Sequence, residues 1–161
     1  MAWDAFLTLE GVSGESQRAG HEGEIELISF SFGASNPSSI GIGSGGGTGK
    51  VTLSSFNVMK KTDASSVGMF RASCNGQHFP TAKATLYKSG GDTALQYLLF
   101  EFEEVYVDNI QWSGAEGGDN VPMESVSFSF GKVTITYTQQ NPDGTAGGDF
   151  QGSWDIRTGT E

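Results

Sequence analysis

The chain has very little cysteine, because Cys74 is the only one among its 161 residues. A single cysteine forms no disulfide within a chain and supplies no multi-cysteine metal site, so both features are excluded. At this length one domain buries a sufficient core without such cross-links. The sequence therefore predicts a single domain over residues 1–161.

Basic residues and long apolar runs are also scarce. Nine Lys and Arg residues stand against nineteen Asp and Glu residues, which gives a net charge of −10. Binding to nucleic acid or to an anionic membrane depends on basic side chains, so we expect neither as a partner. No apolar run approaches the ~20 residues that cross a bilayer. The first residues, MAWDAFLTLEG, lack the regions of a signal peptide, so we expect synthesis in the cytoplasm and export by a route without one.

Glycine is abundant instead, and apolar residues alternate with polar ones along most of the chain. Period-two alternation is typical of half-buried strands. It predicts strands over 3–10, 25–32, 51–58, 81–88, 94–102, 104–112, 126–137 and 149–156. The apolar phase changes after Leu27, Leu53 and Gly131, as it does at a bulge or bend. Repeated bends of this kind curl a sheet into a barrel.

One segment, 63–75, has helical features. Asp63 is a suitable N-cap, and a glycine that follows the segment is a suitable C-terminal stop. Val67, Phe70 and Cys74 recur on one helical stripe, so we expect Cys74 to be a buried small hydrophobe rather than a nucleophile. The predicted fold class is mainly β: a compact β-barrel of two curved antiparallel sheets, with one short flanking α-helix and a long glycine-rich extended loop.

The pentapeptide SFSFG occurs twice, at residues 29–33 and at residues 127–131. Alternate side chains of a strand point to opposite faces. Each copy therefore predicts two phenylalanines on a buried face and two serines on a thin polar face. The closing glycine permits a bend after the strand.

The extended loop, residues 36–50, reads NPSSIGIGSGGGTGK. Gly41, Gly43 and Gly46 have the GxGxxG spacing of dinucleotide sites, but that fingerprint follows a strand and opens a helix, whereas a strand follows here. A P-loop is excluded because Val51, rather than Ser or Thr, follows the lysine. We expect no nucleotide cofactor. A second, acidic loop is predicted at 114–120.

Residues with catalytic or metal-binding chemistry are present but not assembled into a motif. His21 lies beside Glu22 and Glu24, where we expect a surface loop rather than a metal or acid–base site. Glu101 and Glu103 alternate with phenylalanines, so we expect them to face outward. No GxSxG elbow holds a serine. The sequence thus predicts no catalytic, cofactor-binding or metal-binding residue, and a protein that is not an enzyme.

Several segments, which keep their order over essentially the whole chain, resemble one known family. They are AFLTLEGVSGESQRAGHEGEIELISFSFG, GSGGGTGKV, ASSVGMFRASCNGQHFPTAKATLYKSGG, QYLLFEFEEVYVDNIQWSG, PMESVSFSFGKVTITYT and SWDIR. The family is Hcp, the haemolysin-coregulated proteins of type VI secretion. Each segment alone is a weak signature, and the ordered series is specific.

This resemblance implies a tube subunit. Hcp proteins fold as a β-barrel with a flanking helix, assemble into hexameric rings, and stack into an inner tube that a sheath surrounds and a spike protein caps. They are exported from Gram-negative bacteria by that machine without a signal peptide, and some carry small effector proteins in the lumen. The expected partners are therefore copies of the chain itself, the spike, the sheath and small effectors.

The resemblance also assigns positions. The lumen-facing position of the family corresponds to Ser31, with Ser29 beside it in the same alternation, so both are expected to face the lumen and contact effectors. The extended loop of the family corresponds to residues 41–50, which are expected to contact a neighbouring ring. The predicted ring-stacking residues are Gly41, Gly43, Ser44, Gly45, Gly46, Gly47, Thr48, Gly49 and Lys50.

Two alternatives remain open on the sequence alone. A stand-alone secreted binding module would expose aromatic side chains such as Trp112 or Trp154, whereas their strand-like alternation predicts burial. A phage tail-tube protein would share the same logic of assembly. An acidic hydrolase is disfavoured, because no acid, base and pocket are matched.

Overall fold

The computed structural model describes residues 3–37, 49–90, 93–118 and 120–161. Strands dominate these residues, and a helix lies between β6 and β7. In chain order the elements are β1 (Asp4–Leu9), β2 (Ile25–Leu27), β3 (Ser29–Ser31), β4 (Ala34–Ser35), β5 (Thr52–Leu53), β6 (Phe56–Lys61), α1 (Ala64–Asn75), β7 (His78–Gly90), β8 (Thr93–Ser113), β9 (Met123–Gln140) and β10 (Ala146–Asp155). The helix predicted over 63–75 is confirmed, whereas the segments 94–102 and 104–112 form one long strand rather than two.

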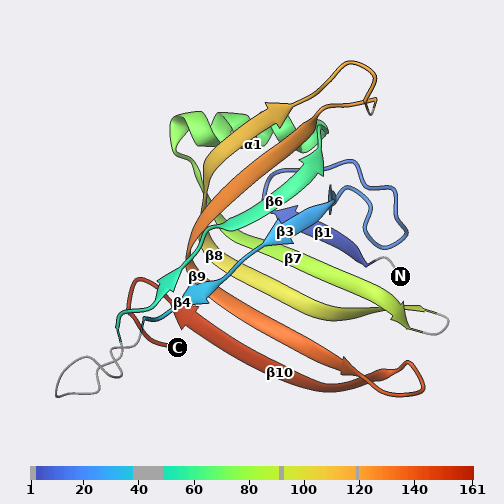
Figure 1. Ribbon diagram of the computed structural model, residues 1–161, viewed down its shortest axis with the longest axis vertical. Coiled ribbons are helices and arrows are strands. Elements are labelled where there is room, and N and C mark those ends of the chain that lie inside the picture. Colours follow the sequence, from blue (N-terminus) through green and yellow to red (C-terminus); the bar gives the residue numbers. More distant parts are fainter. Residues whose placement is uncertain (1–2, 38–48, 91–92, 119) are drawn as a thin grey trace.

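The strands form a curled antiparallel sheet (Figure 1). Its hydrogen-bonded order is β2-β1-β7-β8-β9-β6-β3, and β10 pairs with β9. β2 and β3 end this order on opposite sides, yet they are consecutive in the chain. Between them lies Ile28, whose N–H donates to the carbonyl of Met59 on β6 at 2.7 Å. The sheet therefore closes into a compact barrel, and the predicted phase change after Leu27 is the β2–β3 junction. β4 lies before the glycine-rich segment and β5 lies after it, and these two strands form a separate ladder.

Two long strands, β8 and β9, run through a corner of this barrel (Figure 1). β8 bends at Glu104, whose φ is +53°, a value that is rare for a residue other than glycine. β9 bends at Gly131, which lies opposite Glu104. On one side of the two bends Glu103 pairs with Lys132, and on the other side Val105 pairs with Phe130. We call β3, β6, the first part of β9 and the last part of β8 the front half. The rest of this sheet, which is β1, β2, β7, β10 and the other parts of β8 and β9, forms the back half. The predicted barrel of two curved sheets is confirmed, with β8 and β9 continuous between them.

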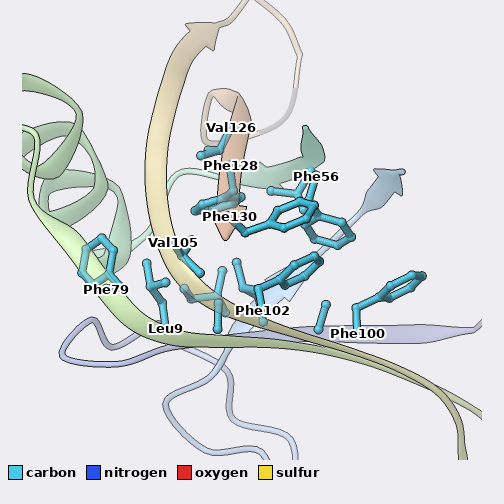
Figure 2. Packing of buried hydrophobic residues seen from close by; sticks show 14 of the residues in the cluster. Leu9, Phe56, Phe79, Phe100, Phe102, Val105, Val126, Phe128 and Phe130 are labelled. Carbon is cyan, nitrogen blue, oxygen red and sulfur yellow. The ribbon is translucent and has the colours of Figure 1, made fainter. Parts of the chain in front are cut away.

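Phenylalanines fill the space between the two halves (Figure 2). The ring centroid of Phe102 lies 4.8 Å from that of Phe56 and 4.8 Å from that of Phe130. Complete burial of one such ring contributes about 1.5–3 kcal/mol to stability. The two SFSFG copies supply Phe30, Phe32, Phe128 and Phe130 to this cluster. The predicted division into a buried aromatic side and a polar side is confirmed for the second copy, whereas Phe30 and Phe32 of the first copy are half-buried against the core.

The first turn of α1 attaches the helix to the front half. Asp63 is the N-cap: its carboxylate accepts the Ser65 N–H at 2.9 Å, and its own N–H donates to Ser66 Oγ at 3.0 Å. The buried ammonium of Lys60 on β6 lies 3.0 Å from Asp63 Oδ1 and 3.2 Å from Glu124 Oε1 on β9. Ser66 also donates to Glu124. We call Lys60, Asp63, Ser66 and Glu124 the helix pin.

The helix pin decides which face of α1 is buried. Because Ser66 must reach Glu124, the side chains of α1 that face the barrel are Ser65, Ser66, Met69 and Ala72. The stripe noted in the sequence lies on the other side, where Val67 is 64% exposed and Phe70 is 49% exposed. The prediction that Cys74 is buried is wrong, since its side chain is exposed.

Candidate interaction face

Outward side chains of the front half form polar rows that cross its four strands in register. The first row, from β3 to β8, is Ser31, Asn57, Ser127 and Asn109. The second row is Ser29, Met59, Ser125 and Gln111. We call this surface the polar face, and it also includes Lys61, Tyr106, Asp108 and Ser129. Its rows alternate with the core residues of the same strands, so the buried cluster fixes their positions.

Several side chains of the polar face are held by hydrogen bonds to one another. Ser127 Oγ donates to Asn57 Oδ1 at 2.6 Å, and Asn57 Nδ2 donates to the Ser55 carbonyl at 3.1 Å. Ser129 Oγ donates to Asp108 Oδ1 at 2.8 Å. Paired groups of this kind need no further ligand to be satisfied. Part of the polar face is therefore held in place by hydrogen bonds among its own short side chains.

The polar face has almost no net charge. Its charged side chains are Lys61 and Asp108, which cancel formally, whereas the whole chain carries −10. Other exposed carboxylates include Glu26 and Glu103 of the back half and the loop residue Glu22. Such a face attracts neither acidic nor basic partners over a distance. Contacts with it rest on single hydrogen bonds and van der Waals packing.

Ser29 and Ser31, the positions predicted to face a lumen, both lie on the polar face. Ser31 is exposed and Ser29 is half-buried. Sequence reasoning did not name Asn57, Asn109 or Gln111, which extend the same rows. The alternation of these residues with apolar neighbours is visible in the sequence. The pairing of β3 with β6 and of β6 with β9, which places them in these rows, is not. That a lumen lies in front of these serines stays a prediction.

Of the predicted stacking residues, Gly49 and Lys50 are described, and 41–48 lie outside the described residues. Both described residues are exposed. The Gly49 N–H donates to the Pro37 carbonyl at 2.9 Å, and a Cβ at Gly49 would stand only 2.5 Å from that oxygen. Glycine is therefore required where the two ends of the loop meet. Beside this point lies an apolar groove whose lining includes Phe32, Leu53, Val133, Ile135 and Trp154.

His21 is half-buried, so its prediction as a surface residue is wrong. Its ring stacks on Phe6 with centroids 4.3 Å apart and planes 5° apart, and the Tyr87 ring lies 4.7 Å away edge-on. His21 Nδ1 lies 2.9 Å from Glu24 Oε2. Burial raises the pKa of the Tyr87 hydroxyl above its ordinary value. No local pattern indicates this packing, because the aromatic partners of His21 come from the distant strands β1 and β7.

The two tryptophans expected to be buried differ from each other. Trp112 is 43% exposed, so that prediction is wrong. It lies at the end of β8, and its ring packs on the exposed side of α1, 5.8 Å from Phe70. Trp154 on β10 is half-buried against the core, in partial agreement with the expectation.

Other chemistry-bearing side chains are not gathered into a site. Glu103 is exposed and Glu101 is half-buried on the face of β8 opposite Phe100 and Phe102, as predicted. Within the described ranges, no group of three or more His, Cys, Asp or Glu side chains is arranged to hold a metal ion. In the same ranges, no helix has the length and apolar character of a bilayer-spanning segment.

The chain is similar to type VI secretion proteins throughout its length. It matches the family model described as type VI secretion system effector, Hcp, over residues 6–137. It is 35% identical to the protein Hcp1 of Pseudomonas aeruginosa over 158 residues, which are 98% of this chain and 97% of that protein. A solved type six secretion system protein superposes with a TM-score of 0.93 at 34% identity, covering 99% of both chains. Hcp1 from Salmonella typhimurium superposes with a TM-score of 0.79 at 27% identity, again covering 99% of both.

These likenesses agree with the ordered segments noted in the sequence. They span both halves of the barrel, including the strands that carry the polar face. Proteins of the matched family are tube proteins that the type VI system secretes. The chain belongs to the Hcp family of type VI secretion proteins.

Proposed function

We propose that this chain is a subunit of the inner tube of a type VI secretion system. Copies of the chain close into hexameric rings, and the rings stack into a tube beneath the spike and inside the sheath. The observation that carries this proposal is the polar face, an almost uncharged surface on a chain with a net charge of −10. A channel lined by it holds small proteins of either charge weakly, which suits a carrier that must release its cargo.

Ser29 and Ser31 line the lumen in this proposal and contact effectors there. Their rows continue through Asn57 and Ser127, so each subunit presents a sheet surface several strands wide. Short hydroxyl side chains leave the lumen open and offer both donors and acceptors. Secretion by the type VI system belongs to the same proposal.

Ring formation is supported by the free edge of the back half. In the described residues β10 pairs only with β9, which leaves one edge of a ten-residue strand without a strand partner. On this hairpin Tyr137 is 41% exposed and Phe150 is 62% exposed, on the same face as Trp154. Free edges and exposed aromatics invite association. A neighbouring copy covers them when heterologous contacts close a ring.

Stacking of rings is assigned to residues 41–50, of which the described Gly49 and Lys50 come shortly before β5. Small contacts suit a tube that disperses after delivery. Shortening the segment 43–49 is expected to leave the number of subunits in the ring unchanged and to reduce tubes in electron micrographs. Loss of the ring itself would instead assign this segment to the interface between subunits of one ring.

The first test is the assembly state of the purified protein. Native mass spectrometry is expected to give a hexamer of the 17.0 kDa chain, and negative-stain images of the same sample are expected to show open rings. A monomer over a wide concentration range would contradict the tube proposal. It would instead favour a solitary secreted binding module on the same barrel.

The second test addresses the lumen. Ser31→Arg places a long charged side chain on the polar face and is expected to preserve the ring while reducing the recovery of co-purified small proteins. The matched control is Thr8→Arg, at an exposed threonine on the outward side of β1 in the back half. Equal recovery of co-purified proteins from both variants would show that Ser31 does not face the lumen.

A further inference from the structure

The motif SWDIR, residues 153–157, lies at the barrel corner. Both strands that join the two halves bend here, β8 at Glu104 and β9 at Gly131. β10 ends at Asp155, and the last residues then fold back in a tight turn. The Ile156 N–H donates to the Gly131 carbonyl at 2.8 Å, which ties this turn to the bend of β9.

The C-terminal turn is organised by Asp155. Its Oδ1 accepts the backbone N–H of Arg157 at 2.8 Å and that of Thr158 at 3.2 Å. Its own N–H donates to the Thr160 carbonyl, and its carbonyl accepts the Gly159 N–H, each at 2.8 Å. Gly159 has a φ of +70°, which favours glycine. The turn is thus a defined platform for the side chain of Arg157.

Arg157 reaches from this platform to both bent strands. Its Nη1 lies 2.7 Å from Glu104 Oε1, and its Nη2 lies 2.7 Å from Asp155 Oδ2. The Nε donates to Asp155 Oδ1 at 3.1 Å, so the contact with Asp155 is bidentate. A Cβ at Gly131 would stand 3.0 Å from Arg157 Nε and 3.1 Å from its Cδ. Gly131 therefore provides the room in which the arginine crosses β9.

We propose that Arg157 is a positioning residue that fixes the angle between the front and back halves of the barrel. We call Glu104, Gly131, Asp155 and Arg157 the corner clasp. Resting on the proposed tube function, we infer further that ring closure depends on this angle. The back half carries the free β10 edge, and the front half carries the polar face. The angle at the corner therefore sets the orientation of the β10 edge relative to the polar face.

The arrangement has the features that give an exposed ion pair a measurable effect. Isolated surface pairs contribute little, but bidentate geometry and a network of several charges are the exceptions. The Asp155 carboxylate holds the pKa of Arg157 above its ordinary value. Glu104 itself has a positive φ, and a non-glycine residue in that region persists where surrounding contacts hold it. Its ion pair with Arg157 is such a contact.

The direct test measures the angle through spin labels on the two halves. Gln111→Cys and Gln139→Cys, in a Cys74→Ser background and diluted with unlabelled protein, place one label on each half. We expect one narrow distance distribution for the parent protein and a broader one after Arg157→Gln. The matched control is Arg71→Gln, an exposed arginine of α1 for which the described residues include no ion pair.

A second variant perturbs the clasp without changing a charge. Gly131→Ala places a methyl group against Arg157 and is expected to broaden the same distribution. Its control is Gly33→Ala, the corresponding position of the other SFSFG copy, where a Cβ meets nothing within 4 Å. Hydrogen exchange at 103–106 and 130–133 is expected to quicken in Arg157→Gln and Gly131→Ala only.

Ring stability is read on the same variants by native mass spectrometry. We expect Arg157→Gln and Gly131→Ala to raise the concentration at which rings dissociate by about tenfold, because each weakens the corner clasp. An unchanged distribution of distances between the labels would show that Arg157 does not fix the angle between the two halves. A broadened distribution with equally stable rings would overturn the link to ring closure. If the parent protein forms no ring, the proposed function fails, and the label distances still decide whether Arg157 fixes the corner.

Discussion

Two charged networks hold this barrel, and they differ in their contact with water. In the helix pin, the side chains of Lys60 and Glu124 have no exposed surface. In the corner clasp, Arg157 is 43% exposed and Glu104 is 50% exposed. The helix pin ties α1 to the front half, and the corner clasp joins the front half to the back half. Pairs of a cation with carboxylates therefore serve one buried attachment and one attachment at the surface.

The difference teaches how burial changes what a charge does. A buried charge that loses its partner keeps its desolvation penalty, so breaking such a pair is strongly destabilising. An exposed charge that loses its partner is solvated by water, and salt screens what remains. The helix pin should therefore act on whether the protein folds. The corner clasp should act mainly on geometry.

The largest expected effect is in the helix pin. Glu124→Ala leaves the Lys60 ammonium buried without that carboxylate and removes the acceptor of Ser66. We expect the free energy of unfolding to fall by about 3–5 kcal/mol, measured by urea denaturation. The matched control is Glu26→Ala, at an exposed glutamate of β2. Equal small losses in both variants would contradict the contrast between buried and exposed networks.

The next effect concerns the pH at which the corner clasp fails. Hydrogen bonds from Arg157 lower the pKa of Asp155 to about 2. A carboxyl with a depressed folded-state pKa stabilises the fold above its unfolded value, 3.8, and loses this as pH falls through about 2. We expect the carboxyl carbon of Asp155 to titrate by NMR with a midpoint near 2. In Arg157→Gln that midpoint is expected to rise toward 3.8, and a midpoint near 3.8 in the parent protein would contradict the strength of the clasp.

The contrast between these networks also marks what the sequence could predict. Alternation along single strands predicted the bends and the apolar faces of both SFSFG copies, and the residue type of Asp63 predicted the cap of α1. All of these depend on neighbours within a few residues. The orientation of α1 and the burial of Lys60 depend on Glu124, which joins them from a distant strand. Sequence periodicity therefore placed the wrong side of α1 in the barrel.

The polar face follows the same division. Ser29 and Ser31 were found through a family resemblance and through their alternation with phenylalanines. Asn109 and Gln111 belong to the same rows only because β8 and β9 pair in one particular register. That register includes an irregularity between Val107 and Asn109, which no local signal in the sequence indicates. Non-local pairing is the information that a single sequence lacks.

The smallest expected effect comes from an ion pair that belongs to neither network. Arg18 and Asp4 form an isolated pair at the surface, with side chains 55% and 46% exposed. We expect Arg18→Ala to change the free energy of unfolding by less than about 1 kcal/mol, and 1 M NaCl to reduce that change further. Urea denaturation at low and high salt measures both. A loss as large as that of Glu124→Ala would mean that the exposure of an ion pair does not determine its contribution to stability. The comparison between the helix pin and the corner clasp would then also be wrong.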